Sequence, residues 1–312
     1  MLTSFFAIVP IFALIVLGFI LRKINMITPE QWRGIESVCF YLLFPALLIT
    51  TLSNSDLAFG DLASFALAIL AMIFTMCLLV FLLRVPLLKL WKVKGPAYTT
   101  IFQTSTRWHG FIAFAIIDDL FGAQGLAILA IAFAVIVPFI NIINIWILAT
   151  YANNKKADFK VVIMTIIKNP LMIGISIGII INLTNFSLPT PIFTGLDLLG
   201  RSALGVSLLA LGAGISYQAL KTSGKEVILA SFLRLILTPV VALIFGLVFG
   251  VKGDVFVILI VASAVPTAVN GYILARTMGG DAELYAATSS AQVLFSFVTL
   301  PIIISLALQM SG

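Results

Sequence analysis

The chain has 312 residues, of which 62% are hydrophobic and only 10% are charged, and its mean hydropathy is +1.20. About a quarter of the residues in a soluble domain are charged, so this composition excludes an ordinary soluble protein. Apolar stretches of about 20 residues recur, as helices need to cross a bilayer, whereas the alternating ten-residue strands of an outer-membrane barrel are absent. The sequence therefore predicts an all-α membrane protein that crosses the lipid bilayer several times.

The net charge of +6 does not indicate a nucleic-acid partner, because cytoplasmic loops of membrane proteins are generally rich in Lys and Arg. Cys39 and Cys77 lie in apolar stretches with no second ligand nearby, so we expect no metal site. No phosphate-binding glycine loop, hydrolase elbow or zinc-binding His pair occurs in the sequence. We therefore expect neither an ATP-driven pump nor an enzyme, and no cofactor, with an intramembrane enzyme kept as an alternative.

A window of about 19 residues, read together with the breaker residues, predicts ten membrane spans. They run near residues 3–21, 34–52, 62–83, 98–117, 124–150, 161–183, 198–219, 227–249, 255–275 and 284–308. The first span is followed by Arg22 and Lys23, which is the reverse of the charge order in a cleaved signal peptide. We therefore expect it to remain as a span with the N-terminus outside.

Basic residues follow the first, third, fifth, seventh and ninth spans, whereas the other connections hold mainly aspartates, with Lys252 as the exception. The expected location is the cytoplasmic (inner) membrane, and the positive-inside rule then places both termini on its outer side. Five spans in each half make the halves enter the membrane in opposite directions, which is typical of inverted repeats. We expect repeats at residues 1–152 and 161–312, joined by a cytoplasmic linker at 153–160.

Polar residues interrupt two of the predicted spans. Residues 104–111 contain Arg107 and the only histidine, His109, and residues 263–272 contain Pro266 and Asn270. An arginine at the centre of a spanning helix costs about 2.5 to 3.5 kcal/mol on insertion scales, so it is expected where water or a partner reaches it. Two broken spans in corresponding halves predict a substrate site between them.

The side chains at these breaks favour a small organic anion. Arg107 offers a planar fork that matches a carboxylate, and the alternative is that it pairs with freed carbonyls or a buried acid, for which Glu36 is the one partner we can name. His109 titrates nearest to physiological pH and is a candidate proton carrier, the alternative being a packing role.

The prolines and glycines near the breaks are expected to shape the site. Pro45 and Pro266 remove backbone donors within spans, and helix amides exposed near Thr267 and Asn270 would receive a carboxylate. Gly110 would supply flexibility in the first break. Pro45 is expected to kink its span. The alternative for Pro266 is that it produces only a structural kink.

Several runs of the chain are similar to one known family. They are Phe44-Pro45-Ala46, Arg107-Trp108-His109-Gly110-Phe111, and Ala264-Val265-Pro266-Thr267-Ala268-Val269-Asn270 with Gly279-Gly280-Asp281-Ala282-Glu283 after it. The chain resembles the auxin efflux carrier family, which includes plant auxin carriers and bacterial permeases labelled as malate or malonate transporters. The resemblance implies ten helices in inverted repeats, similar to bile acid:sodium symporters, with spans four and nine unwound and crossing, an elevator-like motion, and a homodimer through spans two and seven. His109 stands where members carry asparagine, and the proline common in that segment is missing, which affects the substrate and the coupling ion.

The sequence thus predicts a secondary transporter, or permease, that moves a small carboxylate-bearing anion across the membrane by alternating access, coupled to protons through His109. The expected substrate contacts are Pro45, Arg107, His109, Gly110, Pro266, Thr267 and Asn270. The alternative within transport is a sodium-coupled carrier similar to bile acid symporters.

Overall fold

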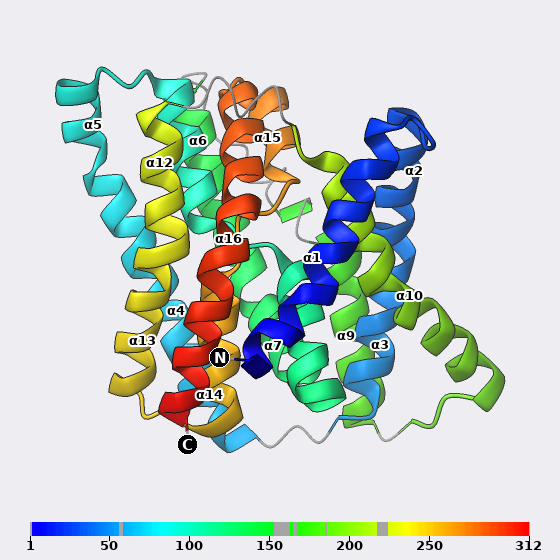
Figure 1. Cartoon of the computed structure of the whole chain (residues 1–312). Helices are drawn as coiled ribbons and strands as arrows, with labels where there is room; N and C mark the ends of the chain where they lie inside the picture. Colours follow the sequence, from blue (N-terminus) through cyan, green and yellow to red (C-terminus); the bar gives the residue numbers. More distant parts are fainter. Residues whose placement is uncertain are drawn as a thin grey trace.

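The computed structural model describes residues 2–55, 59–152, 163–164, 167–184, 186–216 and 224–311. Within these ranges every regular element is a helix (Figure 1), as the sequence predicts. Six described helical stretches are long and apolar enough to cross a membrane, and two shorter apolar helices accompany them. The predicted linker at 153–160 lies outside the described residues.

The helices have the following bounds in chain order. They are α1 (Leu2–Lys23), α2 (Pro29–Val38), the π-helical turn η1 (Cys39–Leu43), α3 (Phe44–Ser53), α4 (Phe59–Leu82), α5 (Arg84–Trp91), α6 (Gly95–Thr106), α7 (Gly110–Tyr151), α9 (Pro170–Leu183), α10 (Thr190–Gly214), α12 (Lys225–Phe232), the π-helical turn η2 (Leu233–Leu237), α13 (Thr238–Val248), α14 (Gly253–Ala264), α15 (Gly271–Met278) and α16 (Ala282–Ser311). Helix α7 holds the end of the fourth predicted span and the whole of the fifth, and between them Gly122 adopts the non-helical angles φ 58° and ψ −149°.

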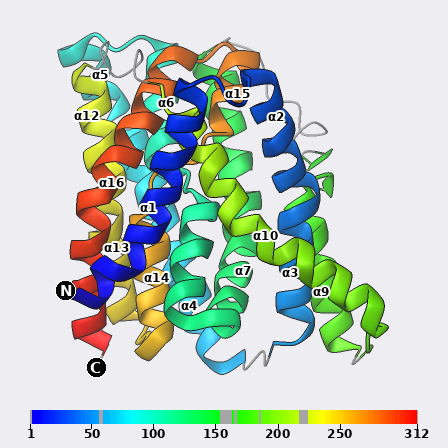
Figure 2. The same ribbon diagram turned by 45° about the vertical axis from the view of Figure 1, so that its right-hand side comes forward.

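The helices form two groups that meet at α7 and where α1 packs on α16 (Figures 1 and 2). In one group α1 lies along α10 and α3 lies along α9, and in the other α13 packs on α4 and α14 packs on α16. The contact of α1 with α10 is close: a Cβ added at Gly18 or Gly212 would collide with the backbone carbonyl of Leu209 or Ile15. Small residues allow such an approach of two membrane helices.

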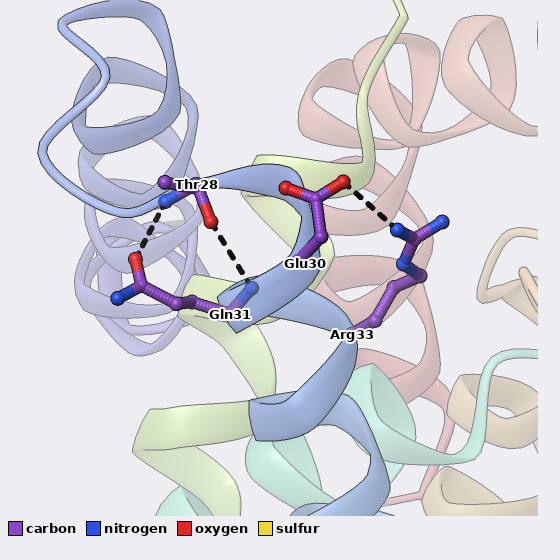
Figure 3. Close-up of polar contacts among 4 residues, drawn as sticks. All are labelled: Thr28, Glu30, Gln31 and Arg33. Carbon is purple, nitrogen blue, oxygen red and sulfur yellow. Dashed lines mark hydrogen bonds and ion pairs between the residues drawn. The ribbon is translucent and has the colours of Figure 1, made fainter.

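The second predicted span begins earlier than the sequence pattern indicates. Thr28 accepts a hydrogen bond from the Gln31 amide at 3.3 Å, and the Gln31 side chain accepts one from the Thr28 amide at 2.8 Å (Figure 3). This capping box starts α2 at Pro29, whereas hydropathy placed the start of the span at Gly34. An exposed ion pair of Glu30 with Arg33, at 2.9 Å, follows on the same polar turn.

Two π-helical turns precede prolines. Pro45 follows η1, where the wider turn accommodates the missing backbone donor, so a distortion is present as the sequence predicts. Pro239 follows η2 in the same way, and the Thr238 hydroxyl donates to the Leu233 carbonyl at 2.8 Å. Pro45 packs against α9, since a Cβ added at Gly174 would lie 2.9 Å from the Pro45 Cα.

Candidate functional site

The first break lies between α6 and α7. The helix α6 ends where the Arg107 amide donates to the Gln103 carbonyl at 2.9 Å, and Arg107 (φ −74°, ψ 154°) and His109 (φ −90°, ψ 91°) are then extended. Helix α7 restarts at Gly110, where an added Cβ would lie 2.5 Å from the Phe133 ring. Gly110 therefore allows a close approach of the break to the second half of α7.

The second break lies between α14 and α15. Val265 is extended (φ −67°, ψ 151°), as expected for a residue that precedes a proline, and α15 begins only at Gly271. The hydroxyl of Tyr285, from α16, donates to the Ala268 carbonyl at 2.6 Å and lies 3.2 Å from the Thr267 hydroxyl. The break is therefore a non-helical segment of six residues between two helix ends, and the Tyr285 hydroxyl holds it in place.

The two breaks touch each other. The backbone amide of His109 donates to the carbonyl of Pro266 at 2.7 Å, although the residues belong to distant parts of the chain. The polar interruptions seen in the sequence therefore meet in space, where the first supplies a backbone donor and the second a backbone acceptor. Unpaired backbone groups are costly inside a membrane, so this contact stabilises both breaks.

Gln292 of α16 joins both breaks to a third helix. Its side-chain oxygen accepts from the Thr267 amide at 2.9 Å, and its side-chain nitrogen lies 3.1 Å from the Thr104 carbonyl and 3.2 Å from the Ala230 carbonyl. The side chain is fully buried. Sequence reasoning missed Gln292 and Tyr285, and the signal that pointed to Gln292 was an amide within an apolar span.

Arg234, from η2, was also missed. Its side chain is only 2% exposed, and it donates from Nε to the Val265 carbonyl at 2.8 Å and from Nη2 to the Ala262 carbonyl at 3.3 Å. These carbonyls belong to the C-terminal end of α14, where a cation offsets the helix dipole. A cavity of about 10 Å³ adjoins Arg234, which is room for about one water molecule. A lone arginine in an apolar span was the available sequence signal.

Arg107 differs from Arg234 in having free donors. Arg107 is buried, yet its Nε and Nη2 have no hydrogen-bond partner, and no carboxylate of the described residues forms an ion pair with it. The suggested pairing with Glu36 is therefore wrong: α2 begins close to the end of the molecule where α1 finishes, and Glu36 has Arg22 and Arg33 as its charged neighbours. Arg107 therefore keeps two buried donors, Nε and Nη2, without a partner among the described residues.

Other buried polar atoms near Arg107 also have no partner. Both ring nitrogens of His109, both amide atoms of Gln103 and the hydroxyl of Ser105 are unpaired. Buried polar groups are nearly always hydrogen-bonded in native proteins, so this concentration of unpaired atoms is unusual. The unpaired atoms lie on one short segment, residues 103–109, next to the crossing.

The remaining expected contacts are placed differently. The Pro266 carbonyl accepts from His109 and the Thr267 amide donates to Gln292, so both groups are already bonded within the protein. Asn270 is exposed, and its side chain makes no capping bond to α15. Pro45 is on α3, where its neighbour Phe44 stacks on Phe111 with ring centroids 4.1 Å apart. The structure thus brings His109, Gly110, Pro266 and Thr267 to the crossing, and Pro45 lies one residue from an aromatic contact with α7.

Together, the apolar helices and the two crossing breaks define a multi-pass helical membrane protein. The profile of the family described as membrane transport protein matches residues 3–304. The chain belongs to this family, the auxin efflux carriers, as its sequence resemblance indicates.

Relatives match the chain over nearly its full length. An uncharacterised transporter of Methanothermobacter thermautotrophicus is 22% identical over 94% of both chains. One from Methanocaldococcus jannaschii is 24% identical over 92% of this chain and 93% of its own, and the uncharacterised transporter YfdV of Escherichia coli is 24% identical over 97% of both. The similarity therefore covers both broken helices.

Proposed function

We propose that this protein is a secondary transporter for a small carboxylate-bearing organic anion, with Arg107 as the principal anion contact. The observation that carries the proposal is a buried guanidinium with free Nε and Nη2 donors at the crossing of two broken helices. A guanidinium binds a carboxylate through two parallel hydrogen bonds, and such charge-assisted bonds are about twice as strong as neutral ones. The family and the names of the relatives favour a transporter over an intramembrane enzyme.

The proposed architecture is ten spans in two inverted repeats, residues 1–152 and 161–312. It is supported by the reciprocal packing of α1 on α10 and of α3 on α9, which is the pattern expected when two repeats exchange partners. In an elevator-like cycle, the group with both breaks would move against the group with α1, α3, α9 and α10. A homodimer through the second and seventh spans belongs to the same proposal.

The proposed orientation follows from charge. Helix α1 ends in Arg22 and Lys23, α5 begins at Arg84, and α12 begins at Lys225, and these helix ends lie at one end of the molecule (Figure 1). Helix α1 begins, and α16 finishes, at the other end. The positive-inside rule would place the basic end in the cytoplasm and both termini on the outer side of the inner membrane.

Coupling to protons through His109 is proposed over coupling to sodium. His109 is buried with both ring nitrogens unpaired, so it is free to exchange a proton with a ligand or water. A sodium site would need several oxygen ligands, but two carbonyls at the end of α14 already accept from Arg234, and the described residues contain no cluster of metal-binding side chains. Replacing sodium with potassium in an uptake assay separates the two, because sodium coupling requires loss of uptake.

The anion site is tested by thermal stabilisation of the detergent-purified protein with a panel of mono- and dicarboxylates. A ligand present at 100 times its dissociation constant stabilises the folded state by about 2.7 kcal/mol, so one acid of the panel is expected to raise the melting temperature. Arg107→Gln should lose this response while folding normally, because no internal bond to Nε or Nη2 is lost.

Arg201→Gln is the matched control. Arg201 is an exposed residue of α10, paired with Asp197 at 2.7 Å, and its loss changes the net charge equally. The control should keep the full response to the acid. A panel in which no acid stabilises the native protein, or an Arg107→Gln variant with an unchanged response, would contradict the anion site.

A further inference from the structure

Helix α5 has the composition of a helix that lies at a membrane surface. Residues 84–94 contain four basic side chains, Arg84, Lys89, Lys92 and Lys94, and no acidic one. The same segment exposes Val85 (54%), Leu88 (52%) and Leu90 (76%). It extends from the bundle at the end where α1 finishes and α12 begins (Figure 1). Basic and apolar side chains together are typical of segments that contact lipid headgroups.

A cavity of about 120 Å³ lies beneath this helix. It is lined by Arg84, Leu87, Leu88, Val93, Gly95, Tyr98, Thr150 and Tyr151, which come from α5, the connection after it, the start of α6 and the end of α7. The wall is therefore part apolar and part hydroxyl, with one guanidinium. Such a wall offers apolar contacts to the acyl chains of a glycerophospholipid, and hydroxyl and guanidinium donors to its phosphate.

A contact with an aromatic ring holds the Arg84 guanidinium in place without using its hydrogen-bond donors. The guanidinium lies over the Tyr151 ring, 4.1 Å from the centroid, and among the described residues no carboxylate or carbonyl accepts a hydrogen bond from it. Stacking fixes the plane of the guanidinium while leaving its N–H groups free. A phosphate in the cavity would receive these donors.

A second cation stands close to the end of α5. Lys225, the first residue of α12, has its Nζ 4.9 Å from the centroid of the Trp91 ring and 3.5 Å from the Trp91 carbonyl. The ammonium is exposed, so it is accessible from the membrane surface. One cation, Arg84, is thus the first residue of α5, and the other, Lys225 of α12, lies against Trp91, the last residue of α5.

We propose that the cavity beneath α5 binds the phosphate headgroup of an anionic phospholipid, with Arg84 as the contact inside the cavity. Lys225 lies outside the cavity lining, against Trp91 at the other end of α5, and adds positive charge near the site. The apolar wall of Leu87, Leu88 and Val93 favours a lipid over a free anion, because part of the ligand must be hydrophobic to cover it. The site is separate from the crossing, so the proposal stands independently of the transported substrate.

The test compares two lipids added to the full-length protein in a neutral detergent. Phosphatidylglycerol and phosphatidylcholine with identical chains are titrated, and the melting temperature and the lipid retained in native mass spectrometry are recorded. Phosphatidylglycerol should stabilise the protein and be retained, and phosphatidylcholine should do neither. Equal effects of the two lipids would overturn the proposal, as would inorganic phosphate reproducing the whole shift, since the site would then be one for a free anion.

Two variants and a control locate the site. Arg84→Gln is expected to weaken the apparent affinity for phosphatidylglycerol about fivefold, which corresponds to roughly 1 kcal/mol per basic side chain near a membrane surface. Lys225→Gln should weaken it as well, and it serves if Arg84→Gln fails to fold. Arg276→Gln, an equal charge change on the exposed last turn of α15, should leave the affinity unchanged. A loss in Arg276→Gln as large as in the other two would overturn the assignment to α5.

Discussion

Two buried glutamines provide a matched test of how the broken helices are held. Gln292 on α16 bonds to Thr267, Thr104 and Ala230, whereas Gln103 on α6 is equally buried but both of its amide atoms lack partners. The same substitution, Gln→Leu, keeps the approximate volume at each site. It removes a hydrogen-bonded amide in one case and an unbonded amide in the other.

The expected magnitudes follow from the groups left behind. In Gln292→Leu the Thr267 amide loses its bond to Gln292, and so does the Thr104 carbonyl, which is too close to the end of α6 for regular helical pairing. Each buried unpaired group costs about 1–3 kcal/mol, which gives a loss of roughly 2–6 kcal/mol. The Ala230 carbonyl contributes less because it also accepts from the Leu233 amide. Gln103→Leu removes a desolvated amide without breaking a bond, so stability should be unchanged or higher.

The assay is thermal unfolding of both variants in the same detergent, followed by the fluorescence of the native tryptophans. A loss of about 3 kcal/mol corresponds to a fall in melting temperature of roughly 6–12 °C for Gln292→Leu, by the scaling for large domains. Gln103→Leu should show no fall. If Gln103→Leu lost as much as Gln292→Leu, the difference in hydrogen bonding between the two amides would be refuted.

Two further predictions concern packing and the second break. On α10, Gly212→Ala should lower the melting temperature because the new methyl group meets the backbone of Ile15, an overpacking that costs about 1–3 kcal/mol; Gly205→Ala on the same helix has open space and should be neutral or stabilising. A neutral Gly212→Ala would argue against the close contact of α1 with α10. Tyr285→Phe removes the hydroxyl that bonds to Ala268 and should cost about 1–3 kcal/mol in thermal unfolding, and a variant as stable as the native protein would show that α16 does not hold the second break.

Much of the architecture follows from local properties of the sequence. Hydropathy alone requires membrane helices, because an apolar stretch of about 20 residues is stable in a bilayer only when its backbone bonds are made internally. Pro266 and the polar run around Arg107 end helices through local chemistry, so both breaks were located correctly. The start of α2 was placed late, since a capping box is polar and hydropathy does not register it.

Only the tertiary structure decided which groups meet at the breaks. A buried polar residue in an apolar span shows that a partner is needed, but the carbonyl that Gln292 meets lies 188 residues away, on Thr104. In the same way, both Arg107 and Arg234 fall within predicted spans, yet Arg234 is bound to the end of α14 and Arg107 has two unpaired donors. Local patterns fix helices and their ends because those depend on neighbours in the chain. The pairing across the crossing depends on how distant helices pack, and that is set by the whole fold.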